Sequence, residues 1–421
     1  MLYSKYILEN KQKVIEKLKT RNFDTSIVEK IFEILKNKNS IMTEVQNLEN
    51  QRNRISAMIG KFVREKKDTS ELKNNVLTIN KTINDLNTTL NNLNVEFNSL
   101  NYLIPNLPDD SVPIGNSEDD NVILETFDQL GRKLVKAQKP HYEIGVELDI
   151  LDFKRAVKMS GSRFAIFKNE GSQLVRALIS FMLDNHIAND YVEITTQTLV
   201  STNTMYGTGQ LPKFHEDLFK IENYDLWLIP TAEVTLTNFH NDEILDLSKP
   251  KKYVGYTKCF RAESGSGGKD TKGLIRSHEF HKVELVKITN ANDAEEEFNK
   301  TVKDAENILQ KLEIPYRKIL LSTGDLGFSS KKTIDLELWL PSEQRFREVS
   351  SISYFGDFQA RRAKIRYKEN NKNHYAHTIN GSGLAIDRVF AAILEQYQNE
   401  NGTITIPKVL VPYMNNKKEI K

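Results

Sequence analysis

Three separated stretches of the sequence combine arginines, carboxylates and small residues in a way that suits a bound triphosphate. The first is the Thr-Ala-Glu triplet 231–233, and the second spans 261–284 across a Gly-Ser loop. The third pairs residues 347–351 with residues 380–388. Arginine presents a planar fork of donors that matches phosphate oxygens, and it keeps its charge. Each fragment alone is typical of a surface ion pair or a turn, but together they predict a phosphate-binding bowl lined with acids.

The glycines of the second stretch do not form a P-loop. That motif needs four residues between its glycines and a Ser or Thr directly after its lysine. Here only two residues separate Gly265 from Gly268, and Asp270 follows Lys269. We therefore interpret the loop as a mobile segment beside the bowl.

Histidines and cysteines give no support for a zinc site. His278 and His281 are three residues apart, as are His374 and His377, but neither pair brings a third ligand of zinc type. Cys259 is the only cysteine, which excludes a disulfide framework and a cysteine-cluster metal site and fits a reducing compartment. We expect no zinc. No Ser/His/Asp or Cys/His arrangement is evident either, which suits a reaction driven by positioning and charge neutralisation.

The overall composition narrows the class of protein further. The 421 residues suffice for two or three domains, and 59 Lys+Arg against 57 Asp+Glu leave a formal charge of +2. Such a balanced chain has no general basic field, so any nucleic-acid surface must be local. The N-terminal residues are charged by position 5 and lack an apolar core, and no stretch approaches about eighteen consecutive apolar residues. We expect a cytoplasmic protein without membrane segments.

Two heptad runs near the N-terminus must place a rod in front of the body. The first run is Ile41, Val45, Leu48, Arg52, Ile55, Ile59 and Phe62, and the second is Leu72, Val76, Ile79, Ile83, Leu86, Leu90, Leu93, Phe97 and Leu100. A short polar break, 66–69, separates them, and no proline occurs before Pro105. The spacing predicts an antiparallel two-helix coiled coil over about 27–101, with arms of roughly 45 Å.

The outer half of this rod is basic. Between residues 50 and 67 a single acid, Glu65, accompanies Arg52, Arg54, Lys61, Arg64, Lys66 and Lys67. A local basic stripe on a long polar rod is what contact with a phosphate backbone needs. The alternatives are a dimerisation or spacer rod and an ordinary solvated face.

The remainder of the chain predicts an α+β body with an antiparallel sheet. The proline- and acid-rich stretch 104–121 cannot continue a helix, so we divide the chain into a helical domain 1–103, a linker 104–123 and a body 124–421. Apolar spacing predicts helices over 172–186 and 294–312. Alternating segments, mostly consecutive, predict strands at 224–238, 251–263, 281–289, 333–340 and 345–354.

These stretches also carry a family resemblance. The motifs are LDFKRAVKMSGSRF (151–164), MYGTGQLPKF (205–214), the TAE triplet, the block from FRAE to KVE (260–284), EVSSISYFGDFQARRAKIRY (348–367) and HTINGSGLA (377–385). With them the sequence resembles the bacterial-type seryl-tRNA synthetases, which are class II aminoacyl-tRNA synthetases, over essentially its whole length. TAE, GTGQLPKF and DFQARR are serine-type signatures within that class.

The resemblance implies a fold, an assembly and a reaction. The fold is an antiparallel sheet flanked by helices, preceded by the coiled-coil arm, and the assembly is a homodimer. In the reaction, ATP and L-serine give seryl-adenylate and pyrophosphate, and the seryl group then passes to the 3′-terminal adenosine of serine tRNA. The arm would reach toward the long variable arm of that tRNA.

The resemblance also assigns residues to each ligand. Serine would be bound by Thr231, Ala232, Glu233, Glu284, Asn380 and Ser382. ATP would be bound by Arg261, Ala262, Glu263, Arg276, Phe280, Val283, Glu348, Val349, Ser350, Ser351 and Arg388. The catalytic residues among these would be Arg261, Glu263 and Arg388, and the Mg²⁺ that accompanies ATP would bind Glu348 and Ser351. The tRNA contacts would come from Arg52, Arg54, Lys61 and Arg64.

Individual roles follow from the same resemblance. Thr231 and Glu233 would hold the serine amino group, and Glu284 would receive the hydroxyl. Arg261 would meet the α-phosphate, while Phe280 would stack on adenine.

Two positions depart from the family pattern. The segment 191–197 lacks a proline usually found near Thr195 and Thr196, which weakens the inference of a dimer interface there. Asp387 stands where a small residue is usual, directly before Arg388, which would meet the γ-phosphate.

Two other functions stay open: a degenerate paralogue that binds RNA or regulates, and an enzyme that passes an activated amino acid to an acceptor other than tRNA. The presence of Arg261, Glu284 and Arg388 argues against the first, and the basic arm argues against the second.

Overall fold

The chain divides into two compact units in the computed structural model, which describes residues 1–129, 134–135, 139–265, 268 and 270–421. The first unit is Met1–Pro105 and the second is Asn106–Lys421. All residues expected to bind serine and ATP belong to the second unit, and the basic stripe belongs to the first.

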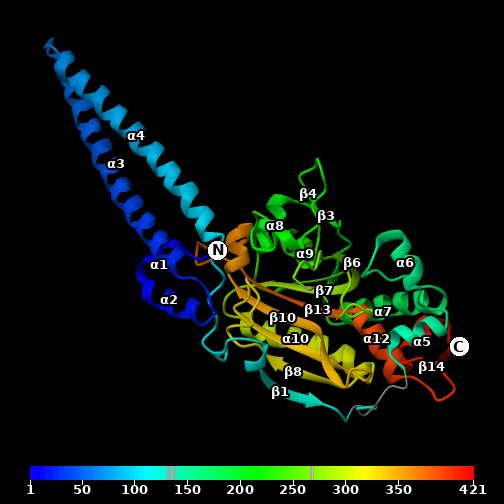
Figure 1. Cartoon of the computed structure of the whole chain (residues 1–421). Helices are drawn as coiled ribbons and strands as arrows, with labels where there is room; N and C mark the ends of the chain where they lie inside the picture. The colour runs from blue at the N-terminus through cyan, green and yellow to red at the C-terminus, as the bar shows by residue number, and fades with distance from the viewer. Residues whose placement is uncertain (130–133, 136–138, 266–267, 269) are drawn as a thin grey trace. The chain divides into compact units, whose positions relative to one another are not determined.

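The N-terminal unit consists of helices only. They are α1 (Ser4–Glu9), α2 (Lys11–Lys19), α3 (Ser26–Arg64) and α4 (Ser70–Asn101), and the long helices α3 and α4 pack side by side as a hairpin (Figure 1). Every residue of the two heptad runs is buried or half-buried, while most residues between them are exposed. The predicted coiled-coil arm is therefore confirmed.

Local hydrogen bonds close the outer end of the hairpin. Helix α3 ends at Arg64, and α4 begins at Ser70. The Asp68 carboxylate accepts both the Ser70 N–H (2.9 Å) and the Ser70 hydroxyl (2.7 Å), and these bonds lower the pKa of Asp68. An acid at this end also complements the dipole of α4. The short polar turn thus starts the second helix as the sequence requires.

An eight-stranded sheet forms the centre of the second unit (Figure 1). In spatial order its strands are β1 (Val122–Phe127), β8 (Tyr316–Leu320), β9 (Lys332–Leu340), β10 (Arg345–Gly356), β13 (His377–Ala385), β7 (Glu279–Thr289), β6 (Lys251–Phe260) and β2 (Val192–Glu193). All neighbours are antiparallel except β2 and β6. The predicted α+β class is confirmed, and β6, β7, β9 and β10 lie where alternation predicts strands.

Helices and short strands surround this sheet. The helices are α5 (His141–Glu147), α6 (Phe153–Ser160), α7 (Asn169–Ile187), α8 (Thr202–Thr208), α9 (Glu233–Asn238), α10 (Ala294–Lys311), α11 (Phe358–Ala363) and α12 (Ile386–Gln396). The short strands are β3 (Leu199–Ser201), β4 (Leu226–Leu228), β5 (Ile244–Leu245), β11 (Arg366–Glu369), β12 (Lys372–Tyr375), β14 (Ile404–Thr405) and β15 (Glu419–Ile420). Single 3₁₀ turns are η1 (Glu118–Asp120), η2 (His215–Asp217), η3 (Lys408–Leu410) and η4 (Pro412–Met414).

Strand β7 shows how the sheet separates core from site. Val283 and Leu285 are fully buried in the large hydrophobic core that also contains α7, α10 and α12. Because successive side chains of a strand point to opposite faces, Lys282 and Glu284 face the other way. The polar positions of β7 are thereby placed on the face that carries the cavity described below.

The alternating segment 224–238 is not the single strand that its pattern predicts. It contains β4 and then, after Pro230, the helix α9. Proline cannot donate to a strand ladder, which ends the strand there. The residues of α9 from Glu233 to Thr237 are all buried, so polar and apolar positions alternate in sequence without separating into a wet and a dry face.

The proline-rich stretch after the arm lies against the second unit from Asn106 onward. The Asn106 side chain donates to the Phe355 carbonyl at 2.7 Å, and its backbone N–H donates to the Phe328 carbonyl at 2.9 Å. Asp109 forms an ion pair with Lys331 at 3.0 Å. These contacts give residues 106–109 a defined path without helix or strand.

Candidate active site

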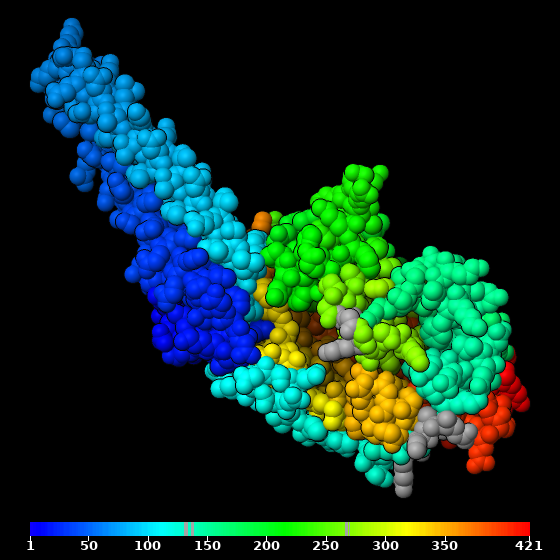
Figure 2. All heavy atoms as spheres, viewed as in Figure 1, coloured from blue at the N-terminus to red at the C-terminus, as the bar shows by residue number. Residues whose placement is uncertain are grey.

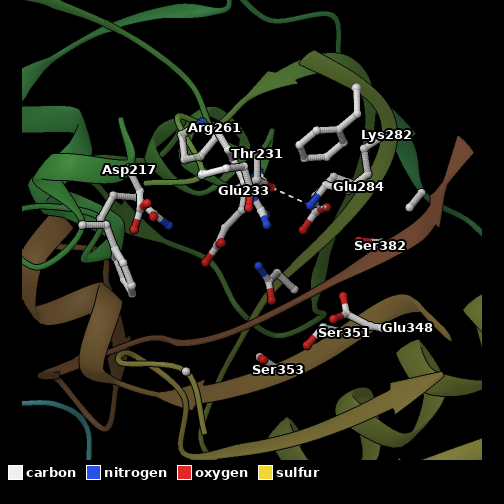
Figure 3. Close-up of a pocket in the computed structure, with 18 of the residues that line it drawn as sticks. Asp217, Thr231, Glu233, Arg261, Lys282, Glu284, Glu348, Ser351, Ser353 and Ser382 are labelled. Carbon is white, nitrogen blue, oxygen red and sulfur yellow. Dashed lines mark hydrogen bonds and ion pairs between the residues drawn. The ribbon is translucent and has the colours of Figure 1, made fainter. Parts of the chain in front are cut away.

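A cavity of ≈ 620 Å³ opens on the polar face of the sheet (Figure 2, Figure 3). That volume is in the range of small-molecule sites. The predicted residues that line it are Thr231, Glu233, Arg261, Glu263, Arg276, Phe280, Glu284, Glu348, Val349, Ser351, Asn380, Ser382 and Arg388. Residues far apart in the sequence are thus brought into one place.

A few predicted residues lie behind this lining. Ala232 and Val283 are fully buried in the two hydrophobic cores beside the sheet. The Ser350 hydroxyl donates to the Ser382 carbonyl at 2.6 Å, and the Ala262 N–H donates to the Asp217 carbonyl at 2.9 Å. These four residues support the wall of the cavity.

Glu233 is held at the inner end of the cavity by α9 and α11. Its side chain is 7% exposed, and its Oε1 accepts the Gln359 amide at 2.6 Å. The Gln359 carbonyl oxygen in turn accepts the Thr378 hydroxyl at 2.7 Å, which fixes the amide orientation. Burial, and next the neighbouring Glu284, raise the pKa of Glu233 to about 7. An acid in this setting is poised to receive a cation.

Strand β7 supplies a buried pair next to Glu233. Glu284 is 1% exposed and lies opposite Ser382 in the ladder between β7 and β13. Lys282 forms an ion pair with Glu284 and donates to the Thr231 hydroxyl at 2.8 Å (Figure 3). Sequence reasoning missed Lys282 and Gln359. The signal for Lys282 was its i, i+2 spacing from Glu284, which puts both on one face of a strand.

Arginines line another part of the cavity. The Arg276 guanidinium donates to Glu263 at 2.8 Å, and that of Arg261 lies 5.2 Å from the centre of the Phe280 ring. Arg388, on α12, donates from Nε to the Ile275 carbonyl at 3.3 Å. The arginines are therefore oriented by carboxylate, aromatic and backbone partners.

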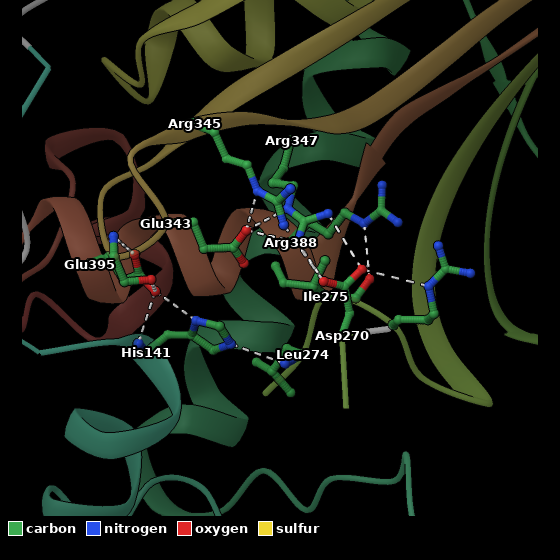
Figure 4. Close-up of polar contacts among 11 residues, drawn as sticks. His141, Asp270, Leu274, Ile275, Glu343, Arg345, Arg347, Arg388 and Glu395 are labelled. Carbon is green, nitrogen blue, oxygen red and sulfur yellow. Dashed lines mark hydrogen bonds and ion pairs between the residues drawn. The ribbon is translucent and has the colours of Figure 1, made fainter. Parts of the chain in front are cut away.

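Asp270 joins a further arginine group at the end of the Gly-Ser loop (Figure 4). Its Oδ1 accepts from Arg347 at 2.5 Å, and the Asp270 carboxylate lies 3.7 Å from Arg276 and 3.8 Å from Arg345. Burial alone would raise the pKa of Asp270, but the Arg347 hydrogen bond and charge outweigh it and hold that pKa below its usual value. The sequence assigned neither Arg347 nor Asp270 to a ligand, although Arg347 belongs to one of the three stretches of the predicted bowl.

Oxygen atoms that could bind a cation lie on β9 and β10 beside the arginines. Glu348 and Ser351 line the cavity and also an adjoining hollow that contains Asp335. Burial, and next the charge of Glu348, raise the pKa of Asp335 well above its usual value. Its Oδ1 is buried without a hydrogen-bond partner among the described residues. A cation bound beside Asp335 would relieve its repulsion with Glu348.

The unusual Asp387 has a defined partner. It is 5% exposed, its Oδ2 accepts the backbone N–H of His281 at 2.7 Å, and its Oδ1 lies 3.1 Å from His281 Nδ1. A small residue could not make these bonds.

His278, by contrast, has its Nδ1 3.0 Å from the Arg261 carbonyl. Across the described residues no three His, Cys, Asp or Glu side chains are grouped as metal ligands.

Comparison with known proteins agrees with this geometry. Residues 1–108 match the family described as the Seryl-tRNA synthetase N-terminal domain. Residues 218–397 match the tRNA synthetase class II core domain (G, H, P, S and T). A serine–tRNA ligase of Mycoplasma mobile is 56% identical over 420 residues, covering 99% of this chain and 100% of that protein. The chain belongs to the seryl-tRNA synthetase family.

Solved structures extend the likeness to three dimensions. The seryl-tRNA synthetase of Pyrococcus horikoshii, crystallised with ATP, has a TM-score of 0.94 at 36% identity and covers 100% of this chain and 99% of its own. The cytoplasmic serine–tRNA ligase of Naegleria fowleri, in complex with AMP, has a TM-score of 0.90 at 26% identity with the same coverage. The fold of the chain is thus shared with both structures along its whole length. None of its described helices is long and apolar enough to cross a membrane.

Proposed function

We propose that this chain is a serine–tRNA ligase that uses ATP to activate L-serine and transfers the seryl group to the 3′ end of serine tRNA. The observation that carries the proposal is one cavity that joins a buried acid pair, Glu233 and Glu284, to a set of arginines. An amino acid and a triphosphate need those two environments side by side. The family membership supports the choice of serine and tRNA as the other substrates.

The inner end of the cavity would bind serine. Glu233, with Thr231, would receive the ammonium group as its counter-charge, and Glu284 would accept the hydroxyl. Lys282, which pairs with Glu284, would hold that side chain in place. A site built to hydrogen-bond a substrate hydroxyl rejects the analogue without it by about 10⁴–10⁵-fold, because its buried polar group is left unpaired. Alanine should be refused on that ground, and threonine by shape.

The part of the cavity that is lined by arginines would bind ATP. Phe280 would stack on adenine with the ring face that Arg261 leaves free, and Arg261 would meet the α-phosphate. Arg276 and Arg388 would hold the outer phosphates. A serine carboxylate oxygen attacks the α-phosphorus in line, the bond from that phosphorus to the bridging oxygen breaks, and pyrophosphate leaves. Repulsion between anions is the main obstacle, so fixed arginines supply most of what the protein must add.

Glu348 and Ser351 would hold Mg²⁺ with the nucleotide. Carboxylate and hydroxyl oxygens are ligands of the kind that this ion takes, and the unpartnered Oδ1 of Asp335 nearby fits a cation close by. When bound, the ion neutralises phosphate charge. We propose no role for zinc.

The first unit would serve the second half of the reaction. We propose that residues 1–103 bind tRNA, with Arg52, Arg54, Lys61 and Arg64 on phosphates of its long variable arm, and that residues 124–421 are the catalytic domain after a linker. Arg54, Lys61 and Arg64 are exposed on α3, and Arg52 is half-buried. Such local cations can bind a phosphate backbone although the whole chain is nearly neutral.

We also propose a cytoplasmic homodimer. The two-residue edge strand β2, with Val192 57% exposed, leaves a free sheet edge in the segment that the family resemblance places at the dimer interface. Sedimentation equilibrium at micromolar concentration should give twice the chain mass. A monomer at those concentrations would contradict the dimer and leave the ligase proposal standing.

Charging of tRNA tests the proposal directly. The protein is incubated with ATP, radiolabelled serine and total tRNA, and acid-precipitable, base-labile label is counted. Label should appear only with ATP, and labelled alanine or threonine should give none above the control without enzyme. Serine-dependent ATP–pyrophosphate exchange without transfer to any tRNA would favour a different acceptor. Absence of both activities would favour the RNA-binding paralogue.

A further inference from the structure

A buried histidine–carboxylate pair lies outside the cavity, behind the Gly-Ser loop. His141, at the start of α5, is 2% exposed, and Glu395, near the end of α12, is 1% exposed. His141 Nδ1 lies 2.7 Å from Glu395 Oε1, which also accepts the His141 backbone N–H at 3.0 Å. Glu395 Oε2 accepts the Ser342 N–H at 2.7 Å. Burial would raise the pKa of Glu395, but its hydrogen bond with His141 and the further bonds outweigh it and lower that pKa.

The second ring nitrogen of His141 points to the returning limb of the loop. His141 Nε2 lies 3.0 Å from the backbone nitrogen of Leu274 (Figure 4). A backbone N–H can only donate, so Nε2 must be the unprotonated acceptor. Nδ1 then carries the hydrogen and donates it to Glu395. The two partners together fix one neutral tautomer of the ring.

The loop backbone is fitted closely to this ring. Gly273 has a φ of 77°, and a Cβ built at that position would lie 2.2 Å from His141 Nε2. Any other residue would therefore be strained and would collide with the imidazole. Leu274 and Ile275, which follow, are 3% and 5% exposed. The segment 273–275 is thus anchored, whereas the loop before it is exposed at Ser264 and Gly265.

The anchored segment leads directly to two arginines of the site. Arg276 is the next residue, and the Ile275 carbonyl accepts the Nε of Arg388. From these contacts we infer that His141, oriented by Glu395, is a positioning residue for ATP. It holds 273–276 so that Arg276 and Arg388 face the triphosphate. This inference rests on the proposed ATP site and adds to it two residues that touch no substrate.

Packing alone does not account for such a pair. Burying a histidine and a carboxylate costs solvation, and replacement of a buried pair by well-packed apolar side chains is often neutral for stability. An apolar side chain could not accept the Leu274 N–H, which is buried and would be left without a partner. The hydrogen bond to the loop is therefore the property that selects histidine here.

Two substitutions separate the two bonds of the ring. His141→Asn keeps an amide near the position of Nδ1 for Glu395 but does not reach Leu274. His141→Gln extends to the position of Nε2, where its carbonyl oxygen can accept the Leu274 N–H. Exposed His374 on β12 provides the matched control, as His374→Asn and His374→Gln.

ATP binding is the primary readout, measured by calorimetry without serine or tRNA. His141→Asn should weaken ATP binding by about five- to a hundredfold, the range for a buried amide left unpaired. His141→Gln should restore most of it, and the His374 variants should match the wild type. Hydrogen exchange at the Leu274 amide should be fast in His141→Asn and slow in His141→Gln. In pyrophosphate exchange, KM for ATP should rise in His141→Asn while KM for serine stays within about twofold.

The outcomes that overturn the inference differ from those that overturn the function. Unchanged ATP affinity in a folded His141→Asn variant, or equal damage in the Asn and Gln variants, would make the pair a structural element only. Parallel rises in KM for ATP and serine would mean the same. A wild-type enzyme that binds ATP but charges no tRNA would instead remove the proposed function and leave the positioning role measurable.

Discussion

Serine binding near neutral pH should expel protons from the enzyme, because Glu233 is partly protonated in the free site. Burial and the nearby Glu284 raise the pKa of Glu233 to about 7, so near neutral pH this acid is about half protonated. A bound ammonium group favours the carboxylate and lowers that pKa. Serine must therefore displace the proton wherever Glu233 carries one. Affinity should fall as the pH drops below the pKa of the free site.

The size of the effect follows from that pKa. At pH 6 about nine in ten free sites would carry the proton, and at pH 8 about one in ten. Apparent serine affinity should then be about tenfold lower at pH 6 than at pH 8, with a plateau above about pH 8. At pH 7 about half a proton should be released for each serine bound.

Calorimetry measures both quantities. Serine is titrated into the free enzyme at several pH values, in two buffers of different ionisation enthalpy, and the difference in heat counts the protons. Glu233→Gln provides the control: it should bind serine weakly, without a counter-charge, and with no pH dependence from this position. An affinity that is flat between about pH 6 and 8, with equal heats in both buffers, would refute the reasoning.

Three further predictions follow from the same contacts. Glu233→Gln should stabilise the ligand-free protein. The pKa of Glu233 in the folded protein lies above the ordinary 4.5, so the wild type loses stability as the pH rises from about 4.5 to about 7. In thermal melts, the free energy of unfolding of the variant should exceed that of the wild type by about 3 kcal/mol above pH 7 and equal it below pH 4.5. Equal melting curves at pH 8 would contradict the burial of that charge. Arg261→Ala should slow serine-dependent pyrophosphate exchange by at least about 10²-fold with an unchanged circular dichroism spectrum, and Arg261→Lys should restore little, because a point charge cannot replace the planar fork. A rate within about threefold of wild type would remove Arg261 from the site. Replacement of Arg52, Arg54, Lys61 and Arg64 by Gln should leave exchange intact but weaken tRNA binding and flatten its salt dependence by about 0.7–0.9 log units for each phosphate that is no longer neutralised. Charging at wild-type efficiency would make the arm a spacer.

Sequence periodicity predicted what local chemistry determines. The heptads of the arm place each seam residue against its partner helix, and strand β9 alternates as its sequence does. The prediction of one strand over 224–238 was wrong because α9 is buried on all sides. Its sequence therefore shows no difference between exposed and buried positions from which a helical period could be recognised. Hydrophobic periodicity identifies an element that has one exposed face and one buried face, and it gives no signal where both faces are buried.

The residues of the site divide in the same way. The family resemblance assigned Thr231, Glu233 and Glu284 to one pocket, and the structure places all three in the lining of one cavity. The contact between His141 and Glu395 joins positions 254 residues apart, and no local pattern marks either of them. Lys282 lay inside a family motif, yet its partner Thr231 is 51 residues away. Long-range partners of this kind require the fold.

The carboxylate of Asp270 lies among three arginine side chains beside the cavity. Arg276, Arg345 and Arg347 all lie within 3.8 Å of it. Guanidinium groups this close repel one another, and Asp270 shares the task of balancing their charge with Glu263 and Glu343. The residue that ends the Gly-Ser loop thus supplies a carboxylate that lies near all three arginines. Arg276, which we propose binds ATP, is therefore held between two carboxylates, and a triphosphate that binds it would replace anions already in place.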